Sequence, residues 1–332
     1  MKIKRIAGMV LLGLVIIGVL GMTALAVKAY RAPLGPALQG NAPTAMPVNN
    51  QVVSTAIPPM NQAAVCGESA VWNVLVLGSD AAEQRGEKGS DLTRMLRVDF
   101  PNKRVTVYAF PRDLWVDTTG LGLTNPTIGA TRLGMVFYEA RSRSTRTNVK
   151  DAMVDGTSVS ARMLSNNFSI STDHYLTIDL NQIPAMVDIV GGIPINIPHE
   201  TTDPWIGMVI PAGQQTLNGA QFIAYARAMP DSDFGRMQRN NLLLVALQQK
   251  LLDPSVWGNI PQLYEQFNEV IATDLSPEQI NNLTCLLKEV APDAIIQDGV
   301  KQEWTSPGPQ PGSLLWDKTA VLNRMKEMGL IP

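Results

Sequence analysis

The sequence predicts an α/β domain built on a mixed central sheet. A continuous apolar run at Val71–Leu77 stops at Gly78, which is typical of a buried strand. Two further strand-like segments, Met95–Asp99 and Val105–Phe110, are joined by a ProAsnLys turn at 101–103 and therefore form a hairpin. Helical and strand-like segments are interspersed through the rest of the chain. A hairpin inside such a pattern indicates a sheet with both parallel and antiparallel pairs.

The later elements follow from local periodicity and from capping residues. Helices are expected at 159–168, 182–190, 219–229, 235–252, 276–287 and 317–328, and strands at 174–180 and 193–197. Asp233 is expected to cap the helix from 235, and Ser276 the helix that follows it. Residues 117–150 stay unassigned because their glycines, threonines and arginines show no period.

The first residues predict a membrane anchor. Ile6–Val27 contains no charged residue, and at ~1.5 Å per residue such a helix crosses a hydrocarbon core of ~30 Å. Lys2, Lys4 and Arg5 precede it and modestly favour a cytoplasmic N-terminus. A cleaved signal peptide with AlaLeuAla at 24–26 as its cleavage site is the alternative, although its apolar part is usually shorter. Both interpretations place the remaining chain outside the cytoplasm.

The predicted order is a cytoplasmic tail at 1–5, a transmembrane anchor at 6–27, a linker at 28–65 and an extracytoplasmic domain at 66–332. The linker is expected because 31–64 carries six prolines, a single charged residue and no sustained period. The protein would then be a single-pass protein of the cell membrane.

The two cysteines, Cys66 and Cys285, form an even count in an exported chain, which favours a disulfide between them. Two unrelated buried thiols are the alternative. The two histidines, His174 and His199, are too dispersed to build a zinc site with these cysteines. A formal net charge of −2 gives no electrostatic reason to expect a nucleic-acid partner.

Acidic residues stand at the ends of the early strands. Asp80 follows the first strand and Asp91 precedes the second. Mg²⁺ is commonly held by one or two carboxylates together with phosphate oxygens and waters, so this pair is a candidate metal site. Turn capping and solvation of the loop are the alternative roles.

Arginines follow in two places. Arg112, beside Asp113 at the exit of the third strand, could bind a phosphate in bidentate fashion or form an internal ion pair with a neighbouring acid. Arg227, Arg236 and Arg239 form a second group near a helix start, where anions bind readily. Arg236 and Asn240 share a helix face at i and i+4. A solvated basic face is the alternative for this group.

Taken together, these motifs resemble the LytR-CpsA-Psr family over roughly 70–255, and the N-terminal anchor fits that family too. The segments that carry the resemblance are 73–80 (NVLVLGSD), 90–91 (SD), 110–113 (FPRD), 178–198, 217–227 (LNGAQFIAYAR) and 233–239 (DFGRMQR). The resemblance implies a three-layer α/β/α fold with a hydrophobic tunnel for a polyprenyl chain. It also implies transfer of a glycopolymer from a polyprenyl-pyrophosphate carrier to a sugar hydroxyl of peptidoglycan or another envelope glycan.

The resemblance also assigns roles to individual residues. It implies Mg²⁺ held near Asp80 and Asp91. Pyrophosphate contacts are expected from Arg112, Arg227, Arg236 and Asn240, with Asp233 supporting Arg236. The catalytic set is Asp91, Asp113 and Arg112, because an acidic side chain could accept the proton of the acceptor hydroxyl.

Four positions depart from the family pattern. Gly89 stands where the family has arginine, Gly129 where it has asparagine, Met229 where it has a second arginine, and Asn240 where it has glutamine. Replacing arginine by methionine removes a charge and a fork of donors. A second interpretation therefore stays open, a non-catalytic or weakly active polyprenyl-pyrophosphate binder that assists envelope assembly. A simple pyrophosphatase is a third.

Overall fold

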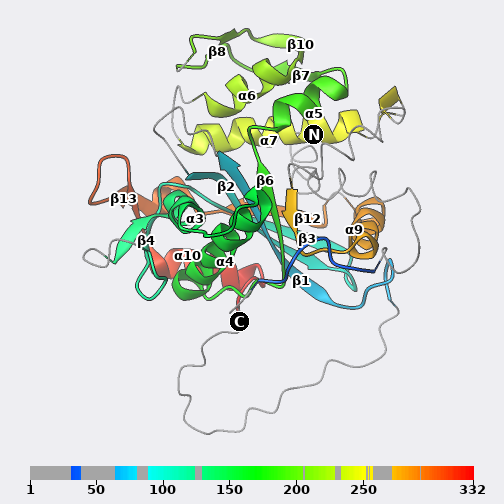
Figure 1. Cartoon of the computed structure of the whole chain (residues 1–332). Helices are drawn as coiled ribbons and strands as arrows, with labels where there is room; N and C mark the ends of the chain where they lie inside the picture. Colours follow the sequence, from blue (N-terminus) through cyan, green and yellow to red (C-terminus); the bar gives the residue numbers. More distant parts are fainter. Residues whose placement is uncertain are drawn as a thin grey trace, which may run out of the picture.

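A six-stranded mixed sheet forms the centre of the molecule (Figure 1). The computed structural model describes residues 31–38, 64–80, 89–123, 129–204, 206–228, 233–251, 253, 255–256, 271–291 and 293–332. The strand order is β11-β6-β1-β2-β3-β12. The strands are β1 (Val71–Asp80), β2 (Gly89–Asp99), β3 (Arg104–Phe110), β6 (His174–Asp179), β11 (Ile271–Thr273) and β12 (Ile295–Gly299). The predicted α/β class with a mixed sheet is confirmed.

The strand directions bring several chain segments to one edge of the sheet. β1 runs parallel to β6, and β3 runs parallel to β12. β2 lies antiparallel between β1 and β3, and β11 is antiparallel to β6. The carboxyl ends of β1, β3, β6 and β12 therefore meet at the edge where β2 begins. We call it the carboxyl edge.

Helices cover both faces of the sheet (Figure 1). They are α3 (Leu133–Ser142), α4 (Val149–Phe168), α5 (Ile183–Ile189), α6 (Gly219–Arg227), α7 (Asp233–Leu251), α9 (Pro277–Glu289) and α10 (Lys318–Glu327). Val74 packs in one core, here the upper core, with α5, α6, α7 and α9. The next residue, Leu75, packs in the lower core with α3, α4 and α10. This alternation follows from the period of two along a strand, and it gives β1 two buried faces.

Short two-stranded sheets surround this centre. β7 (Ile193–Ile197) pairs with β10 (Gly213–Leu217), and β4 (Trp115–Asp117) pairs with β5 (Ala130–Arg132). Two small hairpins complete the set, β8 (Thr201–Thr202) with β9 (Val209–Ile210) and β13 (Thr305–Pro307) with β14 (Leu314–Trp316), the latter preceded by the 3₁₀ turn Gln302–Trp304. The strand predicted at 193–197 is thus correct, but it lies outside the central sheet.

The structure corrects several predicted boundaries. The helix expected at 159–168 begins at Val149, after Asn148, whose side chain accepts from the amide of Lys150. The helix expected from 235 begins at Asp233, so this residue belongs to the first helical turn instead of capping it. α3 lies within the unassigned 117–150. The cap at Ser276 is confirmed, as a capping box with Gln279.

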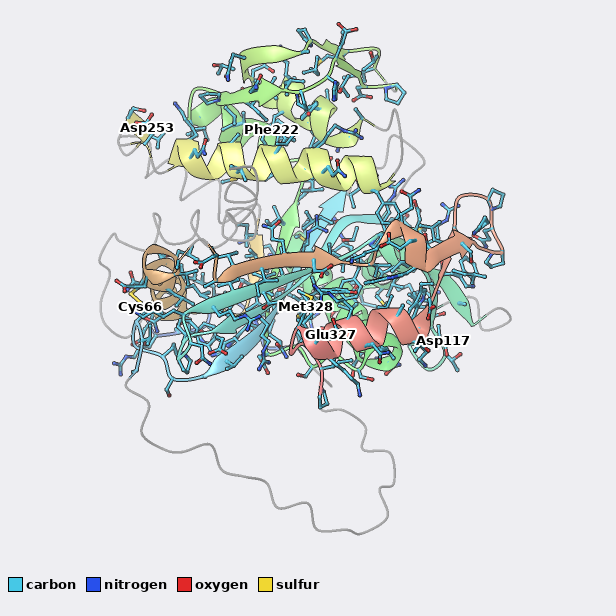
Figure 2. The ribbon with its side chains drawn as sticks, turned by 180° about the vertical axis from the view of Figure 1, so that it is seen from behind. Cys66, Asp117, Phe222, Asp253, Glu327 and Met328 are labelled. Atoms are coloured by element: carbon cyan, nitrogen blue, oxygen red, sulfur yellow. A yellow bond between two sulfur atoms is a disulfide. The ribbon has the colours of Figure 1, made fainter. Side chains whose placement is uncertain are left out.

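A disulfide joins the first residues of the domain to α9. Cys66 and Cys285 are bonded with their Cα atoms 5.6 Å apart and 219 positions apart in sequence. Figure 2 shows Cys66 beside α9. The predicted disulfide is therefore present.

Within the described part of the chain no helix is long and apolar enough to span a membrane. The predicted anchor at 6–27 lies outside the described residues.

Loss of the disulfide should lower stability. A link across a loop this long removes much conformational freedom from the unfolded chain, so replacing both cysteines by serine should reduce the free energy of unfolding by about 2–5 kcal/mol. Urea denaturation followed by tryptophan fluorescence measures this. Dithiothreitol should destabilise the wild type and leave the double-serine variant unchanged. Equal stability of the two proteins without reductant would show that the bond contributes nothing.

Candidate active site

An irregularity between β1 and β2 determines where Asp91 lies. Gly78 pairs with Leu92 and Ser79 with Ser90, so Asp91 is an extra residue opposite the bond between Gly78 and Ser79. A bulge of this kind leaves one residue outside the regular pairing and redirects its side chain. The Ser90 hydroxyl lies 3.2 Å from the Gly78 carbonyl oxygen and 2.9 Å from that of Leu92, which supports the irregular backbone.

Asp91 lies between two arginines from distant parts of the chain. Its Oδ1 is 2.7 Å from Nη1 of Arg112 and 3.5 Å from Nη1 of Arg236. The side chain of Asp91 is 15% exposed, that of Arg112 17% and that of Arg236 5%. Charged groups that are so little exposed to solvent interact more strongly than a surface pair does. The ion pair that the sequence offered as the alternative role of Arg112 is thus present.

The position of Arg112 depends on a close contact with the start of α3. The amide of Gly134 donates to the Arg112 carbonyl oxygen at 2.8 Å. A Cβ on Gly134 would come within 2.8 Å of the Ser90 carbonyl oxygen and 3.0 Å of the Arg112 Cβ. Glycine therefore allows α3 to approach the strand ends that carry Asp91 and Arg112.

Asp113 lies near both Arg112 and Arg132. Its Oδ1 is 3.8 Å from Nε of Arg112 and 3.9 Å from Nε of Arg132. These separations are longer than a good charge-assisted hydrogen bond. Arg132 also donates to the carbonyl oxygen of Pro311, and the amide of Leu314 donates to the carbonyl oxygen of Asp113. The loop before β14 therefore borders the site.

Arg227 reaches the same edge through a residue that sequence reasoning missed. Its Nη2 donates to Oδ1 of Asn181 at 3.0 Å. The Asn181 side chain in turn donates to Oδ1 of Asp179, the last residue of β6, also at 3.0 Å. The AspLeuAsn sequence at the end of the strand predicted at 174–180 was the available signal, since ligands gather at the ends of parallel strands.

Of the remaining predicted residues, two lie on α7 with described side chains, and two have side chains that the structure does not describe. Arg239, which is 7% exposed, donates to the carbonyl oxygen of Ala228 and so fastens the end of α6 to α7. Asn240 is half-buried one turn after Arg236. The side chains of Asp80 and Asp233 lie outside the described part of the structure, so their predicted roles stay predictions.

The structure shows the surroundings of two of the positions that depart from the family pattern, Gly89 and Gly129. A Cβ on Gly89 would be 3.0 Å from the Gly134 carbonyl oxygen, which is tight packing against α3. Gly129 has a φ of +61°, a conformation that glycine and asparagine adopt more readily than other residues. Its carbonyl oxygen accepts from the amide of Thr118 at 2.8 Å. The backbone at this position therefore suits glycine or asparagine.

The donor set is suited to an anion and offers one ligand for a cation. Among the described residues, no three acidic, histidine or cysteine side chains converge as a ready-made metal cage. Both arginine contacts of Asp91 fall on Oδ1, which leaves Oδ2 for another ligand. A Mg²⁺ ion that shares its coordination with a phosphate needs only one or two such carboxylates.

Comparison with known proteins gives a consistent match. The sequence model of the LytR_cpsA_psr family matches residues 48–316. The polyisoprenyl-teichoic acid–peptidoglycan teichoic acid transferase TagU of Enterococcus faecalis is 26% identical over 217 residues, which cover 64% of this chain and 64% of TagU. The regulatory protein MsrR of Staphylococcus aureus is 26% identical over 195 residues, which cover 58% of this chain and 52% of MsrR. The chain thus spans less than two thirds of either relative.

Solved structures share the fold. The crystal structure of Bacillus subtilis TagV superposes with a TM-score of 0.58 at 22% identity, covering 79% of this chain and 96% of that one. At this identity the likeness concerns the arrangement of helices and strands alone.

Removing the shared carboxylate should destabilise the protein. Asp91→Ala would leave Arg112 and Arg236 as buried like charges, and the expected loss in the free energy of unfolding is about 3 kcal/mol. Asp99→Ala, at the other end of β2, is the control. It removes contacts to Asn102 in an exposed turn, worth about 1 kcal/mol. Chemical denaturation of both variants measures the difference. Equal losses would mean that the arginines do not depend on Asp91.

Proposed function

The chain belongs to the LytR_cpsA_psr family, and from this we propose that it transfers a glycopolymer from a polyprenyl-pyrophosphate carrier to a sugar hydroxyl of the cell wall. The observation that carries the proposal is the meeting of Asp91, Arg112 and Arg236 at the carboxyl edge. The name of the relative TagU, a polyisoprenyl-teichoic acid–peptidoglycan teichoic acid transferase, supports the same class of reaction.

The arginines suit a diphosphate. Phosphoryl transfer depends mostly on positioning and on neutralising charge, with little covalent help from the protein. Arg112 and Arg236 lie against one carboxylate oxygen and can each present a planar fork to phosphate oxygens instead. Arg236 lies in the first turns of α7, where the helix dipole also favours an anion. Arg227 would contact the same headgroup from the end of α6.

Asp91 is the proposed metal ligand, together with Asp80. When the donor binds, its phosphates would take over Arg112 and Arg236, and the Asp91 carboxylate would be released to Mg²⁺. The ion would neutralise charge that develops on the leaving polyprenyl phosphate. No ATP is required, because the pyrophosphate linkage of the donor supplies the driving force.

Asp113 is the better placed candidate for the base. Asp91 makes a 2.7 Å ion pair with Arg112 and is the expected metal ligand, which leaves Asp113, close to Arg112 and Arg132, for the role of base. In the proposed step the acceptor oxygen forms a bond to the sugar-linked phosphorus while the bond to the bridging oxygen breaks. The hydroxyl proton passes to Asp113, and polyprenyl phosphate leaves.

We further propose that Ile6–Val27 anchors the chain in the cell membrane, with the catalytic domain outside the cytoplasm. A membrane-bound donor and a cell-wall acceptor meet there. The tunnel for the polyprenyl chain that the family implies stays a prediction.

A binding role without turnover is the second candidate. The observation that favours it is the loss of donors, since Met229 and Gly89 stand where arginines are expected and Asn240 is shorter than glutamine. Such a protein would retain the lipid and release no product.

A transfer assay separates these functions. The full-length protein in detergent, with a lipid-pyrophosphate oligosaccharide, Mg²⁺ and a peptidoglycan glycan, should give a product with a phosphodiester between the two glycans. Arg112→Ala should slow its formation about 10²-fold or more, because a fixed charge on the transition state is lost. Arg104→Ala, an exposed arginine at the opposite end of β3, is the control and should retain activity. Lipid retained in native mass spectra without product would support the binding role, and phosphate release without acceptor would support a pyrophosphatase.

The metal and the base give a further prediction. Chelation by EDTA should abolish transfer, and Mg²⁺ should restore it, because the arginines alone would leave the negative charge of the diphosphate incompletely neutralised. Asp113→Asn should reduce kcat by about 10²-fold or more while the Kd for the donor changes little. Quantification of the product by mass spectrometry gives kcat, and a lipid-binding titration gives the Kd for the donor. Transfer that persists at full rate in EDTA would contradict a metal role, and an unchanged kcat would exclude Asp113 as the base.

A further inference from the structure

Residues 31–38 lie on the folded domain, beside the sheet edge formed by β11. We call this segment the strap; Figure 1 draws it in dark blue beside α9. The amide of Leu34 donates to the Leu275 carbonyl oxygen at 3.2 Å, immediately after β11. Nε of Arg31 lies 3.3 Å from Oε2 of Glu278 in the first turn of α9. A segment that the sequence assigned to an extended linker is therefore attached to the domain at several points.

The fit of the strap is close at Gly35. A Cβ there would lie 2.7 Å from the Thr273 carbonyl oxygen and 3.3 Å from the Tyr175 hydroxyl. That hydroxyl donates to the Pro36 carbonyl oxygen at 3.0 Å. Burial raises the pKa of Tyr175 well above its usual range, so the phenol stays protonated and keeps donating. Leu38 then packs against the lower core. Only glycine allows the strap to lie this near to β11.

The strap follows almost directly after the proposed anchor. Val27 and Arg31 are four residues apart, and an extended chain covers ~3.6 Å per residue, so at most ~14 Å separate the end of the membrane helix from the domain. We propose that the strap holds the β11–α9 edge of the domain against the outer leaflet of the membrane. The proposal rests on the anchor proposed above. Leu34, 45% exposed, would face the lipid.

The disulfide strengthens this conclusion. The strap precedes 39–63 and is bound to α9 through Glu278. Cys66 follows 39–63 and is bound to the same helix through Cys285. Because the strap and Cys66 flank 39–63 and are both attached to α9, the length of that segment adds no reach between membrane and domain. The tether is therefore 28–30, not the proline-rich linker.

The attachment also sets the height of the active site. Thr273 pairs with Leu176 on β6, and Asn181 lies five residues further toward the carboxyl edge. At ~3.3 Å per residue this adds ~17 Å. The arginine cluster would then lie on the order of 30 Å from the leaflet.

Fluorescence quenching in proteoliposomes tests the proposal. The full-length protein would carry a fluorescent amino acid either at Asn281, exposed on α9, or at Gln310, exposed in the loop after β13 on the opposite side of the molecule (Figure 1). Lipids with a nitroxide on the headgroup should quench the label at 281 several-fold more than the label at 310. Equal quenching would overturn the proposal.

Two variants test whether the strap causes the stronger quenching at 281. Gly35→Val should displace the strap and bring quenching at 281 down to the level at 310, while Ala37→Val, at an exposed strap position, should leave it unchanged. If Gly35→Val does not fold, insertion of a 20-residue Gly/Ser segment after Ala29 lengthens the tether without touching the domain and should have the same effect. Quenching that survives the insertion would overturn the proposal. Alkaline flotation of the vesicles tests the membrane anchor separately. Protein that leaves the vesicles would refute the anchor. Protein that stays on them but shows equal quenching at 281 and 310 would refute only the orientation attributed to the strap.

Discussion

The site depends on one carboxylate shared by two buried arginines. Asp91, Arg112 and Arg236 come from a strand, a loop and a helix that are far apart in sequence, and they meet within 3.5 Å. Two guanidinium groups with so little exposure would repel each other without an anion between them. The protein therefore carries its own anion, and a diphosphate with a metal ion is the kind of ligand that could replace it. Stability without the substrate and affinity for it are properties of the same cluster.

The surrounding fold serves this contact. The antiparallel placement of β2 brings its first residues to the edge where β1, β3 and β6 end. The bulge at Asp91 turns the carboxylate out of the ladder, and Gly134 allows α3 to close against Ser90 and Arg112. Arg239 fastens α6 to α7 and thereby fixes the separation of Arg227 from Arg236. The bulge and the close approach of α3 are backbone arrangements, which explains why glycine and serine occur beside the charged residues.

The charged residues of the site could be predicted from the sequence, but the details of their arrangement could not. Val71–Leu77 and the hairpin after it are strongly patterned, so the sheet and the grouping of Asp91 with Arg112 could be anticipated. The bulge could not, because it follows from how two strands pair and leaves no local mark. Asn181 was missed because one amide after a strand has no distinctive period. α3 was missed because its apolar residues follow a segment rich in glycine, and β11 because three residues are too few to show alternation.

The most direct test of the account is a crystal structure of the domain with a short-chain polyprenyl pyrophosphate and Mg²⁺. The account predicts that Arg112, Arg227 and Arg236 contact the diphosphate and that Asp91 has moved from the arginines to the metal. A diphosphate bound elsewhere, with the ion pair between Asp91 and Arg112 unchanged, would contradict it.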